Sequence, residues 1–337
     1  MHSMSRIRAA GMAAGSPRTQ VRPPLHAWEL VSKEMAAAET TLHEMLASHT
    51  PEIHGAAEYL ALAGGKRIRP LLTALGARAV GVQGDLSRLM CVGELIHLGS
   101  LLHDDVVDDA VIRRGKSAPQ HVFGNALVIL TGDFCLARGV LLASEHGGHA
   151  CVSGLAEAVL SMSEGEVLQL RRAGHLSTTR EEYLEIIDRK SAALIAWCAA
   201  VGAHVLNDTD LAERMEAFGR TVGVAFQITD DVLDYGGLEH QTGKGIGKDL
   251  RDRKLTLPLL IALERDPQLR SDLDEAPTAD TLPSLVARVR ATGALDAALD
   301  EAAAYVDRSL THLQVLPESA YKRALGDLAR YLAARVS

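Results

Sequence analysis

Two aspartate clusters with the same spacing stand far apart in the chain. Residues 101–109 read LLHDDVVDD, and residues 226–234 read FQITDDVLD. In a helix, side chains at i and i+4 share one face, so Asp104 pairs with Asp108 and the second cluster repeats the arrangement. A solvated acidic helix end explains one such cluster. Two copies in apolar helices favour Mg²⁺, which is usually held by one or two carboxylates and by substrate phosphates.

Two basic segments offer the opposite charge. Residues 64–70 read GGKRIRP, and residues 113–116 read RRGK. The guanidinium group of arginine and the ammonium group of lysine bind phosphate, although a basic run alone more often lies on the solvated surface. Roughly six aspartates and two diphosphates would be balanced by about three Mg²⁺ and about six cations, which is consistent with two diphosphate substrates. Further candidate cations are Lys190, Lys244, Lys248 and Lys254.

Motifs for other chemistries are incomplete. Gly115-Lys116-Ser117 ends like a Walker A loop, but Ala110 stands where that loop requires a glycine. Residues 243–247 read GKGIG, which is not the dinucleotide spacing. Neither a serine elbow nor a Cys/His pairing stands out, so covalent catalysis has no candidate nucleophile.

The composition indicates the class of fold. Of the 337 residues, 47% are hydrophobic and 23% are charged, which suffices for a buried core. Aromatic residues make up only 4%, and apolar residues recur every three or four positions along most of the chain. These features predict an all-α protein of about ten helices.

The net charge and the cysteines limit the kinds of binding partner and the cellular compartment that the sequence predicts. The formal net charge of -8 argues against a nucleic-acid binder. Four isolated cysteines without a CxxC pair predict a reducing, cytoplasmic compartment. The most apolar stretch, around residues 191–206, is shorter than the roughly 18 to 20 residues that a bilayer requires, so no membrane span is expected.

The chain is expected to consist of a short lead and one domain. Residues 1–28 contain arginines and prolines and no acidic residue before position 29, which predicts a disordered lead. Residues 29–337 show no shift of composition and no repeat, which predicts a single large helical bundle. The spacing of Thr178 and Glu181 predicts a capping box at one helix start.

Taken together, the motifs resemble those of the trans-type polyprenyl diphosphate synthases, which elongate isoprenyl chains. The resemblance covers about Trp28 to Ser337 and rests on GGKRIRP (64–70), ELIHLGSLLHDDVVDDAVIRRGK (94–116), GDF (132–134), GEVLQL (165–170), DRKSA (188–192), FQITDDVLDY (226–235) and GKGIGKDLRDRKLTLP (243–258). It implies a helical bundle with a deep central cleft, usually a homodimer. The implied reaction condenses isopentenyl diphosphate with dimethylallyl, geranyl or farnesyl diphosphate by Mg-assisted ionisation, condensation and proton elimination.

The resemblance also implies roles for single residues. Magnesium, about three ions, would bind Asp104, Asp108 and Asp230, helped by Asp105, Asp231 and Asp234. Isopentenyl diphosphate would bind Lys66, Arg69, His97 and Arg114, and the allylic diphosphate would bind Arg113, Lys190, Ser191, Gln227 and Lys244, with Lys254 as a further substrate ligand. The implied catalytic set is Asp104, Asp105, Asp108, Arg113, Lys190, Gln227, Asp230, Asp231 and Lys244. Two positions depart from the family pattern: Ser191 replaces a common threonine, and Arg253 replaces a glycine that often precedes the lysine.

The helix before the first acid cluster bears on product length. Gly99 and Ser100 stand one turn before Asp104, with Ile96 and Gly93 further back. In the family, bulky aromatics just upstream of the first cluster stop elongation early, and residues 81–122 contain no Phe, Tyr or Trp. The distance from Asp104 to Gly93 is about 16 Å of helix, so a geranylgeranyl or longer product is expected, with the long quinone side chains favoured.

Three interpretations stay open at this stage. His97 lies about 20° from Asp104 on the helical wheel, which fits a substrate ligand but also a histidine satisfied within the core. A class I terpene cyclase would share the fold, but a different metal motif would replace the second cluster. A non-catalytic regulatory subunit of a heteromeric prenyl synthase would have lost acids or cations, and none is visibly missing.

Overall fold

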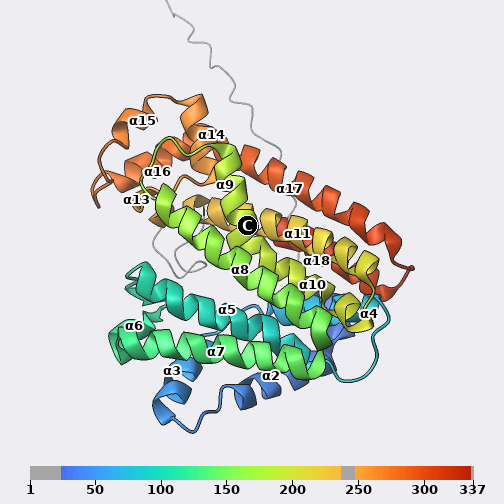
Figure 1. Cartoon of the computed structure of the whole chain (residues 1–337). Coiled ribbons are helices and arrows are strands. Elements are labelled where there is room, and N and C mark those ends of the chain that lie inside the picture. Colours follow the sequence, from blue (N-terminus) through green and yellow to red (C-terminus); the bar gives the residue numbers. More distant parts are fainter. Residues whose placement is uncertain (1–23, 237–246, 335–337) are drawn as a thin grey trace, which may run out of the picture.

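The computed structural model describes residues 24–236 and 247–334, which are almost wholly helical (Figure 1). The first half contains α1 (Leu25–Leu30), α2 (Ser32–Met45), α3 (Pro51–Ala61), α4 (Ile68–Ala79), α5 (Ser87–Val107), α6 (Pro119–Phe123) and α7 (Asn125–His146). The second half contains α8 (Gly148–Arg172), α9 (Arg180–Ile187), the π-helix η1 (Asp188–Ala192), α10 (Ala193–Leu206), α11 (Thr209–Gly236), α13 (Lys248–Arg251), α14 (Leu257–Arg265), α15 (Leu269–Asp272), α16 (Leu282–Ala291), α17 (Ala294–His312), the 3-10 helix η2 (Leu313–Val315) and α18 (Ala320–Ala334). A short antiparallel hairpin joins β1 (Ile112–Arg113) to β2 (Lys116–Ser117).

The all-α prediction is confirmed, and the expected number of helices was too low. The described residues contain more than ten helices, because elements such as α13 and α15 are only four residues long. A helix of one turn shows no apolar period, so the sequence pattern cannot reveal it.

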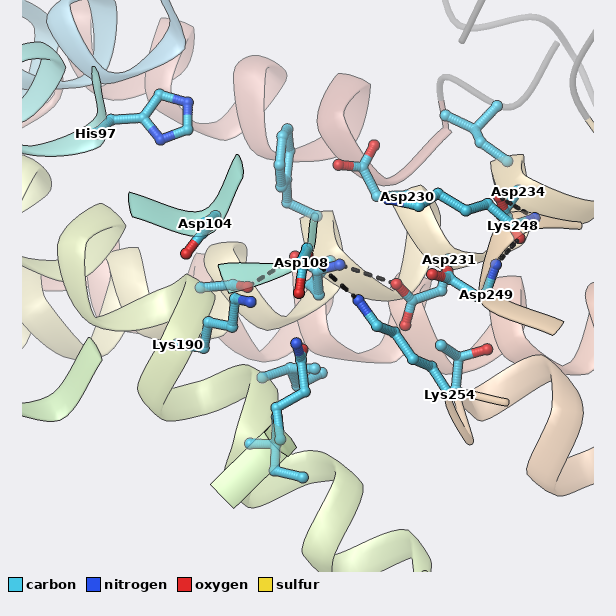
Figure 2. A pocket seen from close by; sticks show the side chains of 18 of the residues that line it. His97, Asp104, Asp108, Lys190, Asp230, Asp231, Asp234, Lys248, Asp249 and Lys254 are labelled. Atoms are coloured by element: carbon cyan, nitrogen blue, oxygen red, sulfur yellow. Dashed lines mark hydrogen bonds and ion pairs between the residues drawn. The ribbon is translucent and has the colours of Figure 1, made fainter. Parts of the chain in front are cut away.

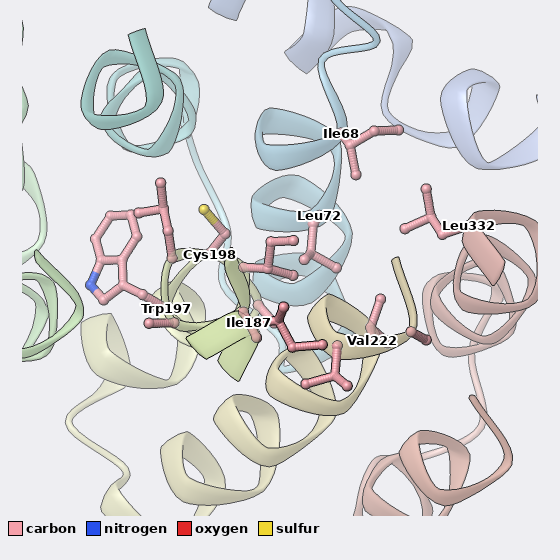
Figure 3. Packing of buried hydrophobic residues seen from close by; sticks show 14 of the residues in the cluster. Ile68, Leu72, Ile187, Trp197, Cys198, Val222 and Leu332 are labelled. Atoms are coloured by element: carbon pink, nitrogen blue, oxygen red, sulfur yellow. The ribbon is translucent and has the colours of Figure 1, made fainter. Parts of the chain in front are cut away.

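Helix α10 runs through the core of the bundle. Every residue from Ala193 to His204 is buried, and Figure 3 shows Trp197 of this helix among apolar side chains of neighbouring helices. Small residues permit close packing here, since a Cβ at Gly76 of α4 would lie 2.5 Å from the Ala199 carbonyl oxygen. The tight contacts of α10 with α4 and α11 fix the two helices that carry the basic loop and the second acid cluster.

The two helices with aspartate clusters belong to different layers. Helix α5 packs on α7, α2 and α4, whereas α11 packs on α10, α17 and α18 (Figure 1). Both helices are more than twenty residues long, and each carries its aspartates in its last two turns or at its C-cap. The bundle therefore brings two acidic helix ends together from separate parts of the fold.

Helix α9 begins with a capping box one residue later than expected. The Thr179 hydroxyl accepts a hydrogen bond from the Glu182 N–H at 3.3 Å, and the Glu182 carboxylate accepts one from the Thr179 N–H at 2.9 Å. The predicted cap, Thr178, instead donates its hydroxyl to the His175 carbonyl oxygen at 2.9 Å. Both threonines have a glutamate three residues later, so the spacing alone did not distinguish them.

The folded domain also begins earlier than expected. Helix α1 starts at Leu25, and Ala27 is fully buried, so the last residues of the predicted lead belong to the fold. One hydrophobic cluster includes residues from Ala27 to Ala333. The remainder of the predicted lead, residues 1–23, lies outside the described residues.

The run Asn125–Arg172, which comprises α7 and α8, is long and apolar enough to cross a membrane. Its 18-residue window has a mean hydropathy of 1.8, and 39% of that window is buried. The stretch that the sequence singled out, residues 191–206, is instead part of the buried core. Large apolar side chains stay exposed on the two helices, namely Ile129, Leu130, Val140, Leu141, Leu160, Val167 and Leu170.

Candidate active site

A cavity of about 540 Å³ lies where α5, α8, α9, η1, α11 and α13 meet (Figure 2). The predicted site residues that line it are Lys66, Arg69, His97, Asp104, Asp108, Arg113, Arg114, Lys190, Ser191, Gln227, Asp230, Asp231, Asp234 and Lys254. Both acid clusters and both basic segments therefore face one space. Of the remaining predicted ligands, Asp105 is fully buried and is not a lining residue, and Lys244 lies outside the described residues.

The Asp104 carboxylate lies in the cavity wall, and its pKa is raised to about 6. Burial is the main cause, and the carboxylates of Glu166 and Asp108 add to it. Lys190 opposes the shift but is itself ion-paired with Glu166. One turn further on, Asp108 lies 3.7 Å from Nζ of Lys254. A cation that enters this part of the cavity would favour the ionised form of Asp104.

Asp105 anchors Arg113. Its buried carboxylate accepts a hydrogen bond from Nε of Arg113 at 2.6 Å and forms an ion pair with Nη2 of the same side chain. Arg113 is 15% exposed and lines the cavity. Asp105 is therefore held against Arg113 in this structure, and its predicted role as a magnesium helper stays a prediction.

The middle aspartate of the second cluster is held by neutral donors. Asp231 is 5% exposed and accepts hydrogen bonds from the Tyr183 hydroxyl at 2.7 Å and from Nε2 of Gln227 at 2.8 Å. Ser191 donates its hydroxyl to Oε1 of Gln227 at 2.7 Å. Burial, and then the nearby Asp249 carboxylate, raise the pKa of Asp231 well above its ordinary value.

The other two aspartates of this cluster have different roles. Asp230 lines the cavity from α11. The Asp234 carboxylate accepts hydrogen bonds from the backbone N–H groups of Lys248 at 3.2 Å and Asp249 at 2.9 Å. Asp234 therefore satisfies free donors at the start of α13, as a capping carboxylate does.

The donor set suits a hard divalent cation. Asp104, Asp108 and Asp230 present carboxylate oxygens to the cavity, and oxygen is the ligand that Mg²⁺ prefers. Within the part of the chain that the structure describes, no three His, Cys, Asp or Glu side chains converge as a ready-made metal cage. Such a site fits Mg²⁺ that enters together with substrate phosphates.

The basic side of the cavity is built around the loop before α4. Arg67 begins this helix with a left-handed φ of 48° and is held by Glu39 at 2.9 Å and by Glu94 at 2.7 Å. Arg114 donates to the carbonyl oxygen of Gly64, so the second basic segment fastens the first. These contacts hold the loop that carries the predicted diphosphate ligands in place.

His97 is a cavity-lining residue that carries no charge at neutral pH. Burial lowers its pKa well below the ordinary value, and the guanidinium groups of Arg69 and Arg114 lower it further. A neutral imidazole beside these cations is suited to hydrogen bonding rather than to charge neutralisation.

A π-helix positions Lys190 and Ser191. The wider turn of η1 lets these adjacent residues both line the cavity. Helix α8 approaches η1 closely at Gly165, where a Cβ would lie 2.5 Å from the Lys190 backbone nitrogen. A glycine is therefore required where α8 crosses this segment.

Arg253, which replaces a glycine of the family pattern, has a backbone conformation that favours glycine. Arg253 has a φ of 52°, in the left-handed region that favours glycine. The next residue, Lys254, still lines the cavity, and its N–H donates to the Asp249 carbonyl oxygen at 2.8 Å. The arginine thus keeps the turn that a glycine would adopt with less strain.

The residues predicted to set product length are not among those that line the cavity. Added Cβ atoms at Gly99 and Gly93 would contact the Gly132 carbonyl oxygen of α7 and Sγ of Cys198 of α10, so both glycines serve helix packing. Ile96 is fully buried, and Ser100 donates its hydroxyl to the His97 carbonyl oxygen. A role of these four positions in product length stays a prediction.

Several lining residues were missed by the sequence reasoning. Glu94 precedes His97 by one helical turn, so its place on the same face was a usable signal. Tyr183 and Asp249 also line the cavity, but nothing in the local sequence indicates that they meet Asp231 or lie near it. Only the packing of α9 and α13 beside α11 brings them there.

An all-α fold in which two acidic helix ends and a basic loop surround one cavity suits proteins that bind diphosphates together with divalent cations. The sequence profile described as polyprenyl synthetase matches residues 50–288. The chain belongs to the polyprenyl synthetase family.

Known relatives agree with this assignment over nearly the whole chain. An octaprenyl diphosphate synthase of Escherichia coli (strain K12) is 35% identical over 308 residues, which cover 89% of this chain and 95% of the relative. Component 2 of a heptaprenyl diphosphate synthase of Geobacillus stearothermophilus is 34% identical over 314 residues, 91% of this chain and 98% of the relative. The crystal structure of a polyprenyl synthase from Caulobacter crescentus CB15, complexed with calcium and isoprenyl diphosphate, has 37% identity and a TM-score of 0.91, and the match covers 95% of this chain and 100% of that one.

Proposed function

We propose that the protein condenses isopentenyl diphosphate with an allylic diphosphate to form a longer trans-polyprenyl diphosphate. The observation that carries this proposal is that Asp104 and Asp108 of α5 line the same cavity as Asp230 of α11 and the cations Arg69 and Arg114. Two diphosphates can be held there on opposite sides of a reacting centre. The octaprenyl and heptaprenyl synthases to which the chain is similar support the same reaction.

The side chains of the cavity suit ionisation without a nucleophile. Arg113 and Lys190 would hold the allylic diphosphate while its C–O bond breaks and the electron pair leaves with pyrophosphate. When bound, Mg²⁺ would supply positive charge that stabilises the departing pyrophosphate. Ile187, Phe226 and Leu233 contribute apolar walls, which exclude water from the allylic cation. The double bond of isopentenyl diphosphate then forms the new C–C bond with the allylic cation, and the released pyrophosphate accepts the proton that is eliminated.

We propose about three Mg²⁺ as the cofactor, held mainly by Asp104, Asp108 and Asp230. Removal of divalent ions with EDTA should abolish turnover, and added Mg²⁺ should restore it. Calorimetric titration with pyrophosphate gives an independent measurement, since binding should require Mg²⁺. Pyrophosphate binding of equal affinity with and without Mg²⁺ would contradict the assignment.

We propose a long-chain product, as in the octaprenyl and heptaprenyl synthases that resemble this chain. The test is chromatography of the products that the purified protein makes from isopentenyl diphosphate and Mg²⁺ with dimethylallyl, geranyl or farnesyl diphosphate. Linear products longer than geranylgeranyl support the proposal, and the primer that reacts fastest identifies the preferred substrate. A cyclic hydrocarbon would favour a terpene cyclase instead.

The product-length assignment of Ser100 has its own test. Ser100→Phe places an aromatic ring one turn before Asp104, where we expect it to shorten the products. Ser100→Ala is the matched control, because it removes the hydroxyl without adding bulk. An unchanged product distribution in Ser100→Phe would contradict the assignment.

We further propose that the protein is a homodimer joined through the apolar face of α7 and α8. Side chains such as Leu130, which is 58% exposed, and Leu160, which is 65% exposed, leave a surface that a second copy would cover. Light scattering should give twice the monomer mass, and Leu130→Glu should shift the protein toward the monomer. A wild-type monomer, or binding to lipid vesicles through this face, would refute the dimer.

A heteromeric enzyme is the second candidate, because a similar relative is named as component 2 of a heptaprenyl diphosphate synthase. In that case the isolated chain would be inactive until a second component is added. Full activity of the isolated chain excludes this alternative.

We also propose a cytoplasmic location, which agrees with the four buried, free cysteines.

A further inference from the structure

A chain of hydrogen bonds links α9 and η1 to α11 in the wall of the cavity. Tyr183 of α9 is 4% exposed and donates its hydroxyl to Oδ2 of Asp231 at 2.7 Å. Oδ1 of Asp231 accepts from Nε2 of Gln227 at 2.8 Å, and Oε1 of Gln227 accepts from the Ser191 hydroxyl at 2.7 Å. All four residues of this chain line the cavity, and the chain ends at Ser191.

The carboxylate sets the direction of every hydrogen bond in this chain. In the structure both Asp231 oxygens accept, Oδ2 from the Tyr183 hydroxyl and Oδ1 from Nε2 of Gln227, so the Gln227 carbonyl oxygen is turned toward Ser191. One N–H of Gln227 then remains, and Gln227 lies in the cavity wall. Without a fixed acceptor, the side-chain amide would be free to present its oxygen to the cavity, where an incoming diphosphate oxygen would be repelled.

Tyr183 occupies the second oxygen of the same carboxylate. Its hydroxyl fixes the rotation of Asp231 so that Oδ1 faces Gln227, and the capping box at Thr179 and Glu182 fixes the start of the helix that carries it. A phenylalanine at this position would keep the buried ring and lose only the donor. The hydroxyl thus has a contribution that can be separated from packing.

We propose that Tyr183 is a positioning residue for the allylic diphosphate, which it affects through Asp231 and the Gln227 amide. The inference rests on the proposed function, because it concerns the diphosphate that this wall of the cavity would bind. It also separates the two neighbouring aspartates of the cluster: Asp231 orients Gln227, whereas Asp230 faces the cavity.

The test compares Tyr183→Phe with Tyr235→Phe. Tyr235 is a second fully buried tyrosine, and its hydroxyl bonds neither Asp231 nor Gln227 in the described part of the chain. In Tyr183→Phe we expect kcat/KM for the allylic diphosphate to fall about 10-fold, a loss of the size typical of one hydrogen bond, with KM for isopentenyl diphosphate unchanged. Tyr235→Phe should retain the wild-type value. Equal losses for both substrates, or in both variants, would overturn the inference.

A double-mutant cycle tests whether Tyr183 acts through Asp231. In an Asp231→Asn background, Tyr183→Phe should cause no further loss for the allylic substrate, because the oriented carboxylate is already gone. An additive loss would show that Tyr183 acts by another route and would overturn the inference.

Calorimetric binding of inorganic pyrophosphate with Mg²⁺ separates this inference from the proposed function. If the wild-type protein binds pyrophosphate but does not elongate, the proposed reaction fails, and Tyr183→Phe is still expected to weaken binding about 10-fold. If wild type elongates and Tyr183→Phe matches it in both kinetics and binding, only the positioning role fails. If wild type binds no pyrophosphate at all, both proposals fail.

Discussion

The two aspartate clusters share one sequence pattern, yet the fold gives their middle residues opposite surroundings. Asp105 on α5 is fully buried and pairs with the cation Arg113. Asp231 on α11 is almost as buried but accepts hydrogen bonds only from the neutral groups of Tyr183 and Gln227 among its described partners. One cluster thus holds a cavity cation in place by charge, and the other holds an amide in place by hydrogen bonds.

The comparison teaches that a shared motif does not imply shared roles for its members. In each cluster the first aspartate, Asp104 or Asp230, faces the cavity. The last aspartate differs again, since Asp108 lies near Lys254 whereas Asp234 caps α13. Each cluster therefore contributes a carboxylate that faces the cavity and one that supports the structure, and the partners of the supporting carboxylate come from the surrounding helices.

Neutralising the two middle aspartates should have the largest and most unequal effects on stability. Asp105→Asn removes the charge of the buried carboxylate that pairs with Arg113, so we expect a loss of about 3 kcal/mol in the free energy of unfolding. Asp231→Asn keeps one acceptor oxygen and removes a carboxylate whose charge burial already disfavours, so its change should stay below about 1 kcal/mol. Urea denaturation of both variants measures the difference. Equal losses would mean that the two clusters are supported alike.

Removing a cavity-facing aspartate should act on turnover. Asp104→Ala is expected to lower kcat at least about 100-fold, equivalent to about 2.7 kcal/mol of transition-state stabilisation, and Asp230→Ala should lower it to a similar extent. Steady-state elongation assays measure both. Asp307→Ala, which removes an exposed carboxylate of α17, is the control. Retained activity in Asp104→Ala would contradict its role as a ligand.

The raised pKa of Asp104 predicts a pH dependence of stability. Its pKa of about 6 in the folded protein lies above the unfolded value, so the folded state binds more protons between about pH 4 and pH 6. The Asp104 contribution should therefore destabilise the substrate-free protein by about 2 kcal/mol as the pH rises from about 4.5 to 7. Denaturation of wild type and Asp104→Asn at both pH values isolates this contribution, because other groups titrate equally in both proteins. An identical pH dependence in the two proteins would refute the assignment.

The sequence predicted which residues would gather but not how they are held. The spacing of the acids and the two basic segments placed most of the predicted ligands around one cavity, because helical periodicity fixes which side chains share a face. The partners of Asp105 and Asp231 were not predictable in this way. Tyr183 meets Asp231 across 48 positions of the chain, and that contact depends on how α9 packs beside α11.

The exposed apolar surface was the other feature that could not be predicted from the sequence. The apolar pattern of residues 191–206 and that of α7 look alike in the sequence, although residues 193–204 of α10 are all buried and α7 leaves Leu130 and Leu141 exposed. Periodicity reports that a face is apolar, whereas the number of neighbours around a helix is decided by the arrangement of the whole bundle.

A smaller effect is expected at the start of α9, the helix that carries Tyr183, which donates to Asp231 of the second cluster. Thr179→Ala removes the hydroxyl that accepts from the Glu182 N–H, which should cost about 1 kcal/mol in the free energy of unfolding. Thr179→Ser keeps a capping hydroxyl and should lose much less, so thermal or urea denaturation of the pair measures the cap itself. If the serine variant loses as much as the alanine variant, the capping box does not stabilise α9. The position of Tyr183 would then depend on the packing of α9 against η1, α8, α11 and α14.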